Sequence, residues 1–538
     1  MSCATSTPRI PLAGVLRLGR PSGIWFKPAL SAVAAVAPPN LTLLALDRLD
    51  LAMYTMAGSL CALYAHNRPY AARARALAWV VLGMLGGLAV ALVTASLTTN
   101  TVALVAVGAL LAAVQKVLCD ATRIGPPGNV VLTFISSAAL FAPQTLGQVP
   151  GHLALGLAAG VWAWLVAMAP GLVRPHGPER RAVAHALNAA AAHADAHRTG
   201  DGHARAAAAA AVHTARQSLL SAGARTAPRR ALEQLVVRAE IALAAPADTD
   251  PARLRGWARD LRGTGPVPQV GAPAADAELT VQRSLLRRGL GPLTPIAVRT
   301  ALGCALAGYA SLALGIGRPY WALVTAAALY QANTTLTWSR GVQRVVGNLV
   351  GVLLFAAVVP LAHLGPAALV LCCLACNFGA EALMGRNYWL GSICVTPMAL
   401  LITEFTGFQE PGRLITERVV DTLVGALVGF AAAVAVTNRR AGHRVEHALT
   451  VVERARERAA RLLAEPHTAP GALASARHDL TAALVELRAT ADAAAGEWWQ
   501  RARPEERVVL AEQAGHRTLA ATVGRVGQSE PTTEDVRP

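Results

Sequence analysis

Residues 318–351, RPYWALVTAAALYQANTTLTWSRGVQRVVGNLVG, carry the pattern that decides the fold of this chain. The stretch opens on the aromatic pair Tyr320-Trp321, continues as an apolar segment, and then turns through Arg340 and Arg344. Tyr and Trp favour the membrane–water boundary, and Arg on a short loop favours the cytoplasmic side. The stretch therefore predicts a helical hairpin that crosses a membrane from outside to inside and back.

The composition is typical of a membrane protein. Of the 538 residues, 54% are hydrophobic and 15% are charged, whereas a soluble chain carries about a quarter charged residues. The formal net charge of +17 fits an excess of Lys and Arg on cytoplasmic loops. A nucleic-acid partner is not expected, because no recognition motif accompanies the basic charge.

Twelve apolar segments approach the length of about 20 residues that a helix needs to cross a bilayer. They form two groups of six on either side of a long polar region. The first group is 28–46, 51–65, 77–97, 102–118, 130–146 and 153–169. The second group is 293–316, 320–336, 342–361, 367–382, 388–405 and 419–436. The pair Pro38-Pro39 predicts a break or kink in the first segment.

The basic residues follow alternate segments of the first group. The loops 96–101 and 145–152 carry no Lys or Arg, whereas the other loops and segment ends carry Arg68, Arg73, Arg75, Lys116, Arg123, Arg174, Arg180 and Arg181. This asymmetry predicts a multi-pass plasma-membrane protein with cytoplasmic N- and C-termini.

The predicted domains follow from these changes in composition. They are a cytoplasmic leader (1–27), a first membrane half (28–173), a cytoplasmic helical region with a Pro/Gly-rich linker at 246–273 (174–290), a second membrane half (291–437), a cytoplasmic helical tail (438–528) and a disordered end (529–538). In the tail, apolar residues recur at helical spacing opposite Arg454 and Arg458, as in an amphipathic helix. Its basic face can touch anionic lipid, or the tail can pack against 174–290.

The two membrane halves repeat several residues at nearly constant offsets. Tyr54 and Tyr64 match Tyr320 and Tyr330, Gly83 and Gly87 match Gly347 and Gly351, and Gly156 and Gly160 match Gly425 and Gly429. Glycines four residues apart let a neighbouring membrane helix approach closely, so we expect these eight glycines at helix contacts. Because each half has an even number of segments, the sequence predicts an all-α fold of two parallel repeats.

Several short motifs in the second half point to a known family. They are Tyr320-Trp321, Thr325, Arg344-x-x-Gly347, Arg386-Asn387-Tyr388, Thr396-Pro397 and Asp421-Thr422-x-x-Gly425. With these motifs the chain resembles the fusaric acid resistance protein-like (FUSC) family of integral membrane proteins, which includes aromatic acid exporters. The resemblance implies export or conduction of organic, often aromatic, carboxylates. The chain is also similar in plan to plant aluminium-activated malate channels, which have six spans and work as dimers. The resemblance leaves open whether this protein forms a homo-oligomer or whether its two halves form a pseudo-dimer within one chain.

Four cationic side chains form the candidate anion pathway: Lys116, Arg344, Arg386 and Arg418. Charges at membrane depth are costly and usually face a cavity or a partner. One interpretation is that they orient helices at the membrane boundary, with Lys116 pairing with Asp120 one turn later. The other is that Lys116, Arg344 and Arg386 form a cationic cytoplasmic vestibule that gathers anions.

Other classes of site have weaker support. The sequence lacks a phosphate-binding loop of the Gly-x-x-x-x-Gly-Lys-Ser/Thr type and a Gly-x-Ser-x-Gly elbow, so we expect neither an enzyme nor a cofactor. Cys372, Cys373 and Cys376 read as small helix filler rather than metal ligands. His193, Asp195 and His197 lie within about one helical turn and could bind a metal. The better interpretation is that they lie on a solvent-exposed, Ala-rich helix without a metal.

The sequence thus leaves two functions open. The first is a transporter or channel whose partners are membrane lipid and a small organic anion. The second is a membrane scaffold without transport, whose cytosolic helices bind a partner.

Overall fold

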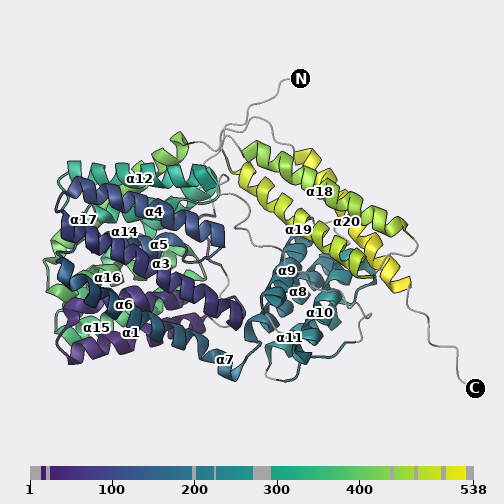
Figure 1. The fold of residues 1–538 in the computed structure, drawn as a ribbon, viewed down its shortest axis with the longest axis horizontal. Helices are drawn as coiled ribbons and strands as arrows, with labels where there is room; N and C mark the ends of the chain where they lie inside the picture. Colours follow the sequence, from purple (N-terminus) through teal and green to yellow (C-terminus); the bar gives the residue numbers. More distant parts are fainter. Residues whose placement is uncertain are drawn as a thin grey trace, which may run out of the picture. The chain divides into compact units, whose positions relative to one another are not determined.

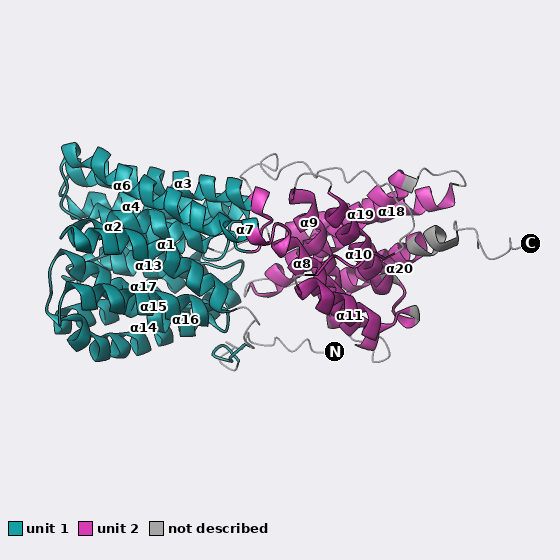
Figure 2. Cartoon of the chain, turned by 90° about the horizontal axis from the view of Figure 1, so that it is seen from below, with its two compact units in different colours: residues 1–66, 73–172, 284–438 teal, residues 67–72, 173–283, 439–538 magenta. Residues whose placement is uncertain are grey.

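The computed structural model describes residues 14–19, 25–196, 202–222, 226–263, 265–270, 293–436, 441–465, 470–497 and 505–528. Within these ranges the chain is helical and contains no β-strand, which confirms the all-α prediction for this part of the protein. The chain divides into two compact units (Figure 2). Unit 1 comprises residues 1–66, 73–172 and 284–438, and unit 2 comprises residues 67–72, 173–283 and 439–538.

Unit 1 holds both membrane halves. The first half contains α1 (Phe26–Ala45), α2 (Ala52–Ser59) with η2 (Leu60–Leu63), α3 (Tyr70–Leu97), α4 (Thr101–Thr122), α5 (Asn129–Leu140) and α6 (Val149–Met168). The second half contains α12 (Thr294–Ala313), α13 (Tyr320–Leu329), α14 (Thr334–Ala362), α15 (Pro366–Met384), α16 (Tyr388–Thr403) and α17 (Pro411–Ala435). Helix α1 continues through Pro38 and Pro39, so the predicted break is not seen.

Nine helices in the described ranges are long and apolar enough to cross a membrane. The other three apolar segments are shorter helices, at Leu49–Leu63, Asn129–Leu140 and Tyr320–Leu329. The prediction of membrane spans is therefore wrong in length for the fifth and eighth segments, whereas the second, residues 51–65, is short in the sequence as well.

The eighth segment is short because polar side chains end α13 early. Tyr330 is extended, with φ −66° and ψ 113°. Asn333 then caps α14 by accepting a hydrogen bond from the Leu336 N–H at 2.8 Å, and the Thr337 hydroxyl accepts one from the Gln331 N–H at 3.1 Å. These side chains satisfy backbone groups that the break would otherwise leave unpaired. All ten residues of α13 are buried, so this helix forms the core of the second half.

The helices of unit 1 pack in a regular order. Within the halves, α2 packs against α6 and α13 packs against α17. Across the halves, α1 packs against α15 and α4 packs against α12 (Figure 1). The first helix of each half thus lies against the fourth helix of the other.

Seven of the eight matched glycines lie at close contacts. A Cβ added at Gly347 would lie 2.6 Å from the Cβ of Ser392 in α16, and one at Gly351 would lie 2.7 Å from the Cβ of Thr396. One at Gly425 would lie 2.5 Å from the Ala322 carbonyl oxygen of α13. One at Gly429 would lie 3.1 Å from Ala326 of α13. The contacts in the first half are made by side chains. A Cβ at Gly87 would lie 2.7 Å from Gln115 Nε2, one at Gly156 would lie 3.0 Å from Leu85 Cδ2, and one at Gly160 would lie 2.9 Å from Val81 Cγ1.

Gly83 differs from the expectation. It is exposed, and a Cβ added there would meet no atom within 4 Å. The spacing of Gly83 and Gly87 suggested a single contact face, but only Gly87 lies on the buried side of α3.

Unit 2 is built from helices before and after the second membrane half. They are α8 (Gly177–Ala196), α9 (Gly202–Ser221), α10 (Ala227–Ala244), α11 (Pro251–Arg262), α18 (Ala441–Ala464), α19 (Pro470–Ala495) and α20 (Glu505–Gln528). Helix α11 buries Leu254, Ala258 and Leu261, so the linker expected at 246–273 contains a packed amphipathic helix. The short α7 (Pro170–Val173) follows α6.

The tail packs against the region 174–290 within unit 2, as one of the two sequence interpretations expected. Glu240 of α10 forms ion pairs with Arg216 of α9 and Arg477 of α19. Burial, together with these two arginines, holds the pKa of the neighbouring His478 well below its usual range, so its imidazole is neutral.

Candidate functional site

Arg418 lies in the first half of α17, where its side chain contacts the start of α13. The side chain is buried, and its guanidinium carbon lies 4.1 Å from the centre of the Trp321 ring. An arginine over the face of a tryptophan is stabilised by a cation–π interaction. The Arg418 Nε and Nη1 atoms are buried and have no hydrogen-bond partner among the described residues. Arg418 is therefore a buried cation with hydrogen-bonding capacity left over.

Asp421 follows Arg418 by almost one helical turn and is also fully buried. Its Oδ1 atom accepts a hydrogen bond from the Ser311 hydroxyl of α12 at 2.6 Å. Its Oδ2 atom has no partner in the described part of the chain. One serine contact is little compensation for a buried carboxylate, which makes Asp421 a functional candidate in its own right.

Arg344 brings a second buried cation from α14. Its Nη1 atom donates a hydrogen bond to the Tyr388 hydroxyl of α16 at 2.7 Å, while its Nε atom has no partner within the described ranges. Arg340, one turn earlier, lies with its guanidinium carbon 4.0 Å from the centre of the same Tyr388 ring. Tyr388 thus links two arginines of α14 to the first turn of α16.

An uncharged network holds the three surrounding helices together. The Thr396 hydroxyl of α16 donates to Asn348 Oδ1 of α14 at 2.8 Å. Asn348 Nδ2 in turn donates to the Thr422 hydroxyl of α17 at 3.1 Å. These bonds fix α14, α16 and α17 relative to one another, because a buried amide must keep its partners.

The charges of this centre do not balance. Arg344 and Arg418 are buried together with the Asp421 carboxylate, while the buried carboxylate of Glu417 is already paired with Arg318 and Arg413. Buried cations are tolerated where an anion or strong acceptors compensate them. Guanidinium groups present planar forks of N–H donors that match a carboxylate. The arrangement is therefore suited to receive an organic anion.

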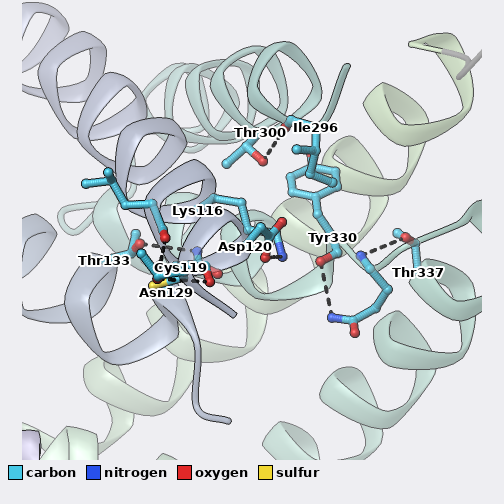
Figure 3. A network of polar contacts seen from close by, with 12 residues as sticks. Lys116, Cys119, Asp120, Asn129, Thr133, Ile296, Thr300, Tyr330 and Thr337 are labelled. Atoms are coloured by element: carbon cyan, nitrogen blue, oxygen red, sulfur yellow. Dashed lines mark hydrogen bonds and ion pairs between the residues drawn. The ribbon is translucent and has the colours of Figure 1, made fainter. Parts of the chain in front are cut away.

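The four residues of the candidate anion pathway are not all brought together. Arg344 and Arg418 belong to the buried centre just described. Lys116 forms an ion pair with Asp120 at 3.0 Å, which confirms the expected pairing (Figure 3). The Arg386 side chain is exposed at the turn between α15 and α16. The structure thus places Lys116 and Arg386 in surroundings typical of helix-orienting charges.

Sequence reasoning missed the polar partners of the centre. Ser311 and Asn348 are buried polar residues within otherwise apolar helices, and that isolation is the signal that could have found them. Thr325 was noted as a motif residue; it lies fully buried on α13, and its hydroxyl has no partner among the residues described.

The residues considered for metal binding form no metal site in the described ranges, where no three His, Cys, Asp or Glu side chains are grouped to hold an ion. Asp195 forms an ion pair with Arg255 instead. His197 lies outside the described residues. Cys372, Cys373 and Cys376 are buried in α15.

Comparison with known proteins finds a match in the second membrane half. A family model described as fusaric acid resistance protein-like matches residues 305–432. The matched residues make up most of the second membrane half. Every residue of the buried centre, from Ser311 to Thr422, lies within the matched residues.

One curated relative extends the comparison. The chain is 30% identical over 190 residues to an uncharacterized membrane protein, YvaC, of Bacillus subtilis (strain 168). The match covers 35% of this chain and 29% of the relative, so the chain spans under a third of that protein's length. No solved structure matches the chain.

Proposed function

We propose that the chain is a transporter that exports or conducts organic carboxylate anions across the plasma membrane. The observation that carries this proposal is the buried Arg418, which lies over Trp321 with two guanidinium nitrogens free of protein partners in the described ranges. The match to the fusaric acid resistance protein-like family model supports a transporter in general terms. Because Arg344 adds a second buried cation, an anion is the cargo that best offsets the charge of the centre.

An aromatic carboxylate is the cargo that we favour. The rings of Tyr320 and Trp321 stand at the start of α13, with centroids 4.8 Å apart, and Tyr388 lies beside Arg344. Aromatic walls next to a cation suit a molecule that has an apolar ring and a carboxylate. A scaffold role is less well supported, because binding a partner through cytosolic helices gives no reason for a charged centre inside the membrane unit.

We also propose that the two halves are parallel repeats and that only the second holds an anion site. Equivalent contacts support the repeat: Gly156 and Gly160 lie between α3 and Tyr54 and Gly58 of α2, and Gly425 and Gly429 face α13. Arg344 stands three residues before Gly347, and Val80 stands three before Gly83. Arg418 stands seven residues before Gly425, and Val149 stands seven before Gly156. The first half therefore has apolar residues where the second has its cations.

The cargo proposal is tested by transport in cells with and without the chain. Cells that express the chain should release preloaded aromatic carboxylates faster than cells that lack it. The same expressing cells should release aliphatic carboxylates more slowly than aromatic ones. Expression and membrane insertion are checked by immunoblotting of membrane fractions. If no carboxylate in a panel of both kinds moves faster, transport is excluded in favour of the scaffold.

The proposed orientation is tested by labelling single cysteines in a version without native cysteines. Cysteines replacing the exposed residues Asn100 and Gln148 should react with an impermeant maleimide in intact cells. A cysteine replacing the exposed Arg181 should react only after the cells are permeabilised. The reason is that arginine-rich loops are retained in the cytoplasm. Labelling of Arg181→Cys but not of Asn100→Cys in intact cells would reverse the orientation.

A further inference from the structure

A short segment before the first membrane helix lies against the second membrane half. Residues 14–19 are held there through their backbone by side chains of α14 and of the turn leading into α16. The bonds run from Gln343 Nε2 to the Val15 carbonyl (2.8 Å), from Asn387 Nδ2 to the carbonyls of Val15 (3.2 Å) and Arg17 (3.0 Å), and from Trp389 Nε1 to the Leu16 carbonyl (3.2 Å).

The main chain of the segment completes the contact. The Gly19 N–H donates to the Arg386 carbonyl at 2.9 Å. A Cβ at Gly19 would lie 2.7 Å from that same oxygen, closer than a side chain tolerates, so the approach requires glycine. Val15 is buried, whereas Leu16 and Leu18 are exposed. Residues 14–17 form a turn, in which the Arg17 N–H donates to the Gly14 carbonyl at 3.1 Å. The recognition is thus of the backbone carbonyls of this turn, with one apolar side chain as anchor.

The residues that hold this segment are direct neighbours in the sequence of two residues of the anion centre. Gln343 directly precedes Arg344 on α14. Asn387 and Trp389 flank Tyr388, whose hydroxyl accepts the hydrogen bond from Arg344. A movement of the α15–α16 turn that released the segment would therefore also move Tyr388, the tyrosine that takes up one of the Arg344 donors.

We propose that Gln343, Asn387 and Trp389 form a peptide-binding surface whose occupant is residues 14–19, and that this docked segment, here called the strap, closes the cytoplasmic end of the anion path. Release of the strap frees Tyr388 and Arg344 to admit a carboxylate. This inference rests on the proposed transport function. Docking of the strap can be measured independently of transport, by the rate at which a cysteine at position 15 is alkylated.

Docking is tested by alkylation of Val15→Cys in a version without native cysteines, in permeabilised membranes. The buried position predicts slow reaction with a maleimide. In the background of Gly19→Val, whose side chain collides with the Arg386 carbonyl, the reaction should be at least about tenfold faster, because the strap is displaced. In the background of Leu18→Ala, which removes only an exposed side chain, the rate should not change. Equal rates in all three would show that the strap is not docked.

Gating is tested by the initial rate of carboxylate export from cells. Gly19→Val and a chain lacking residues 2–19 should both export about threefold faster or more than the natural chain. Leu18→Ala again serves as the matched control. If Gly19→Val exposes Val15→Cys but export stays unchanged or falls at equal membrane insertion, the gate is refuted while transport stands. Absence of export from the natural chain and from every variant would instead refute the transport function.

Discussion

Arg418→Gln should reduce the initial rate of carboxylate transport at least about tenfold, because hydrogen bonds to charged groups contribute about 1.5–3 kcal/mol each. The substitution keeps much of the side chain's length and polarity but removes the cation that lies over Trp321. Since Arg418 is buried with two unpaired nitrogens in the described structure, its loss should not unfold the domain. Arg344→Gln should have a similar effect, reduced in part because one Arg344 nitrogen is already bonded to Tyr388.

The contrast for this prediction comes from the two cations that lie outside the centre. Lys116→Gln and Arg386→Gln should both stay within about twofold of the natural rate, since Lys116 is paired with Asp120 and the Arg386 side chain is exposed. Initial rates are compared at equal amounts of inserted protein. A large loss in Lys116→Gln or Arg386→Gln with little loss in Arg418→Gln would favour the cytoplasmic vestibule instead of the buried centre.

Gly425→Leu should strongly destabilise the membrane unit, because α13 leaves no room for a side chain at this position. A Cβ there would lie 2.5 Å from the Ala322 carbonyl oxygen and 2.8 Å from Thr325 Cβ. Overpacking costs about 1–3 kcal/mol where side chains can adjust, and more where the obstacle is backbone. We expect the Tm of the detergent-solubilised protein to fall by about 5–10 °C. The measurement is the fraction that stays monodisperse after heating.

Gly83→Leu is the matched control, because a Cβ added there would meet no atom within 4 Å and the position is exposed. Its Tm should stay close to that of the natural protein. Gly156→Leu should be intermediate, since its nearest neighbour is the mobile end of Leu85. Equal Tm values for Gly425→Leu and Gly83→Leu would mean that the tight contact between α13 and α17 does not exist.

The sequence predicted the long helices well because their signal is local. A continuous apolar stretch such as the one that became α14 fixes a helix by its own length and hydropathy. The short helices need tertiary information. Residues 320–336 read as one span, yet Asn333 and Thr337 divide them, since caps become favourable only when neighbouring helices supply the remaining contacts.

The candidate site shows the same division between local and tertiary information. The pair Lys116 and Asp120 could be predicted because it lies within one helical turn. Arg344 and Arg418 could be singled out as charges in apolar segments. That Arg418 lies over Trp321 could not be predicted, because the contact depends on how α13 and α17 pack.

Uptake of a labelled aromatic carboxylate such as benzoate into vesicles reconstituted with the purified chain tests the central claim most directly. Vesicles with the natural chain should take up the anion faster than protein-free vesicles, and excess unlabelled benzoate should compete. Vesicles with the double variant Arg344→Gln/Arg418→Gln should match the protein-free ones, although the variant is inserted equally and remains monodisperse. Uptake by the double variant at the natural rate would show that the anion does not pass the buried arginines and would contradict the account.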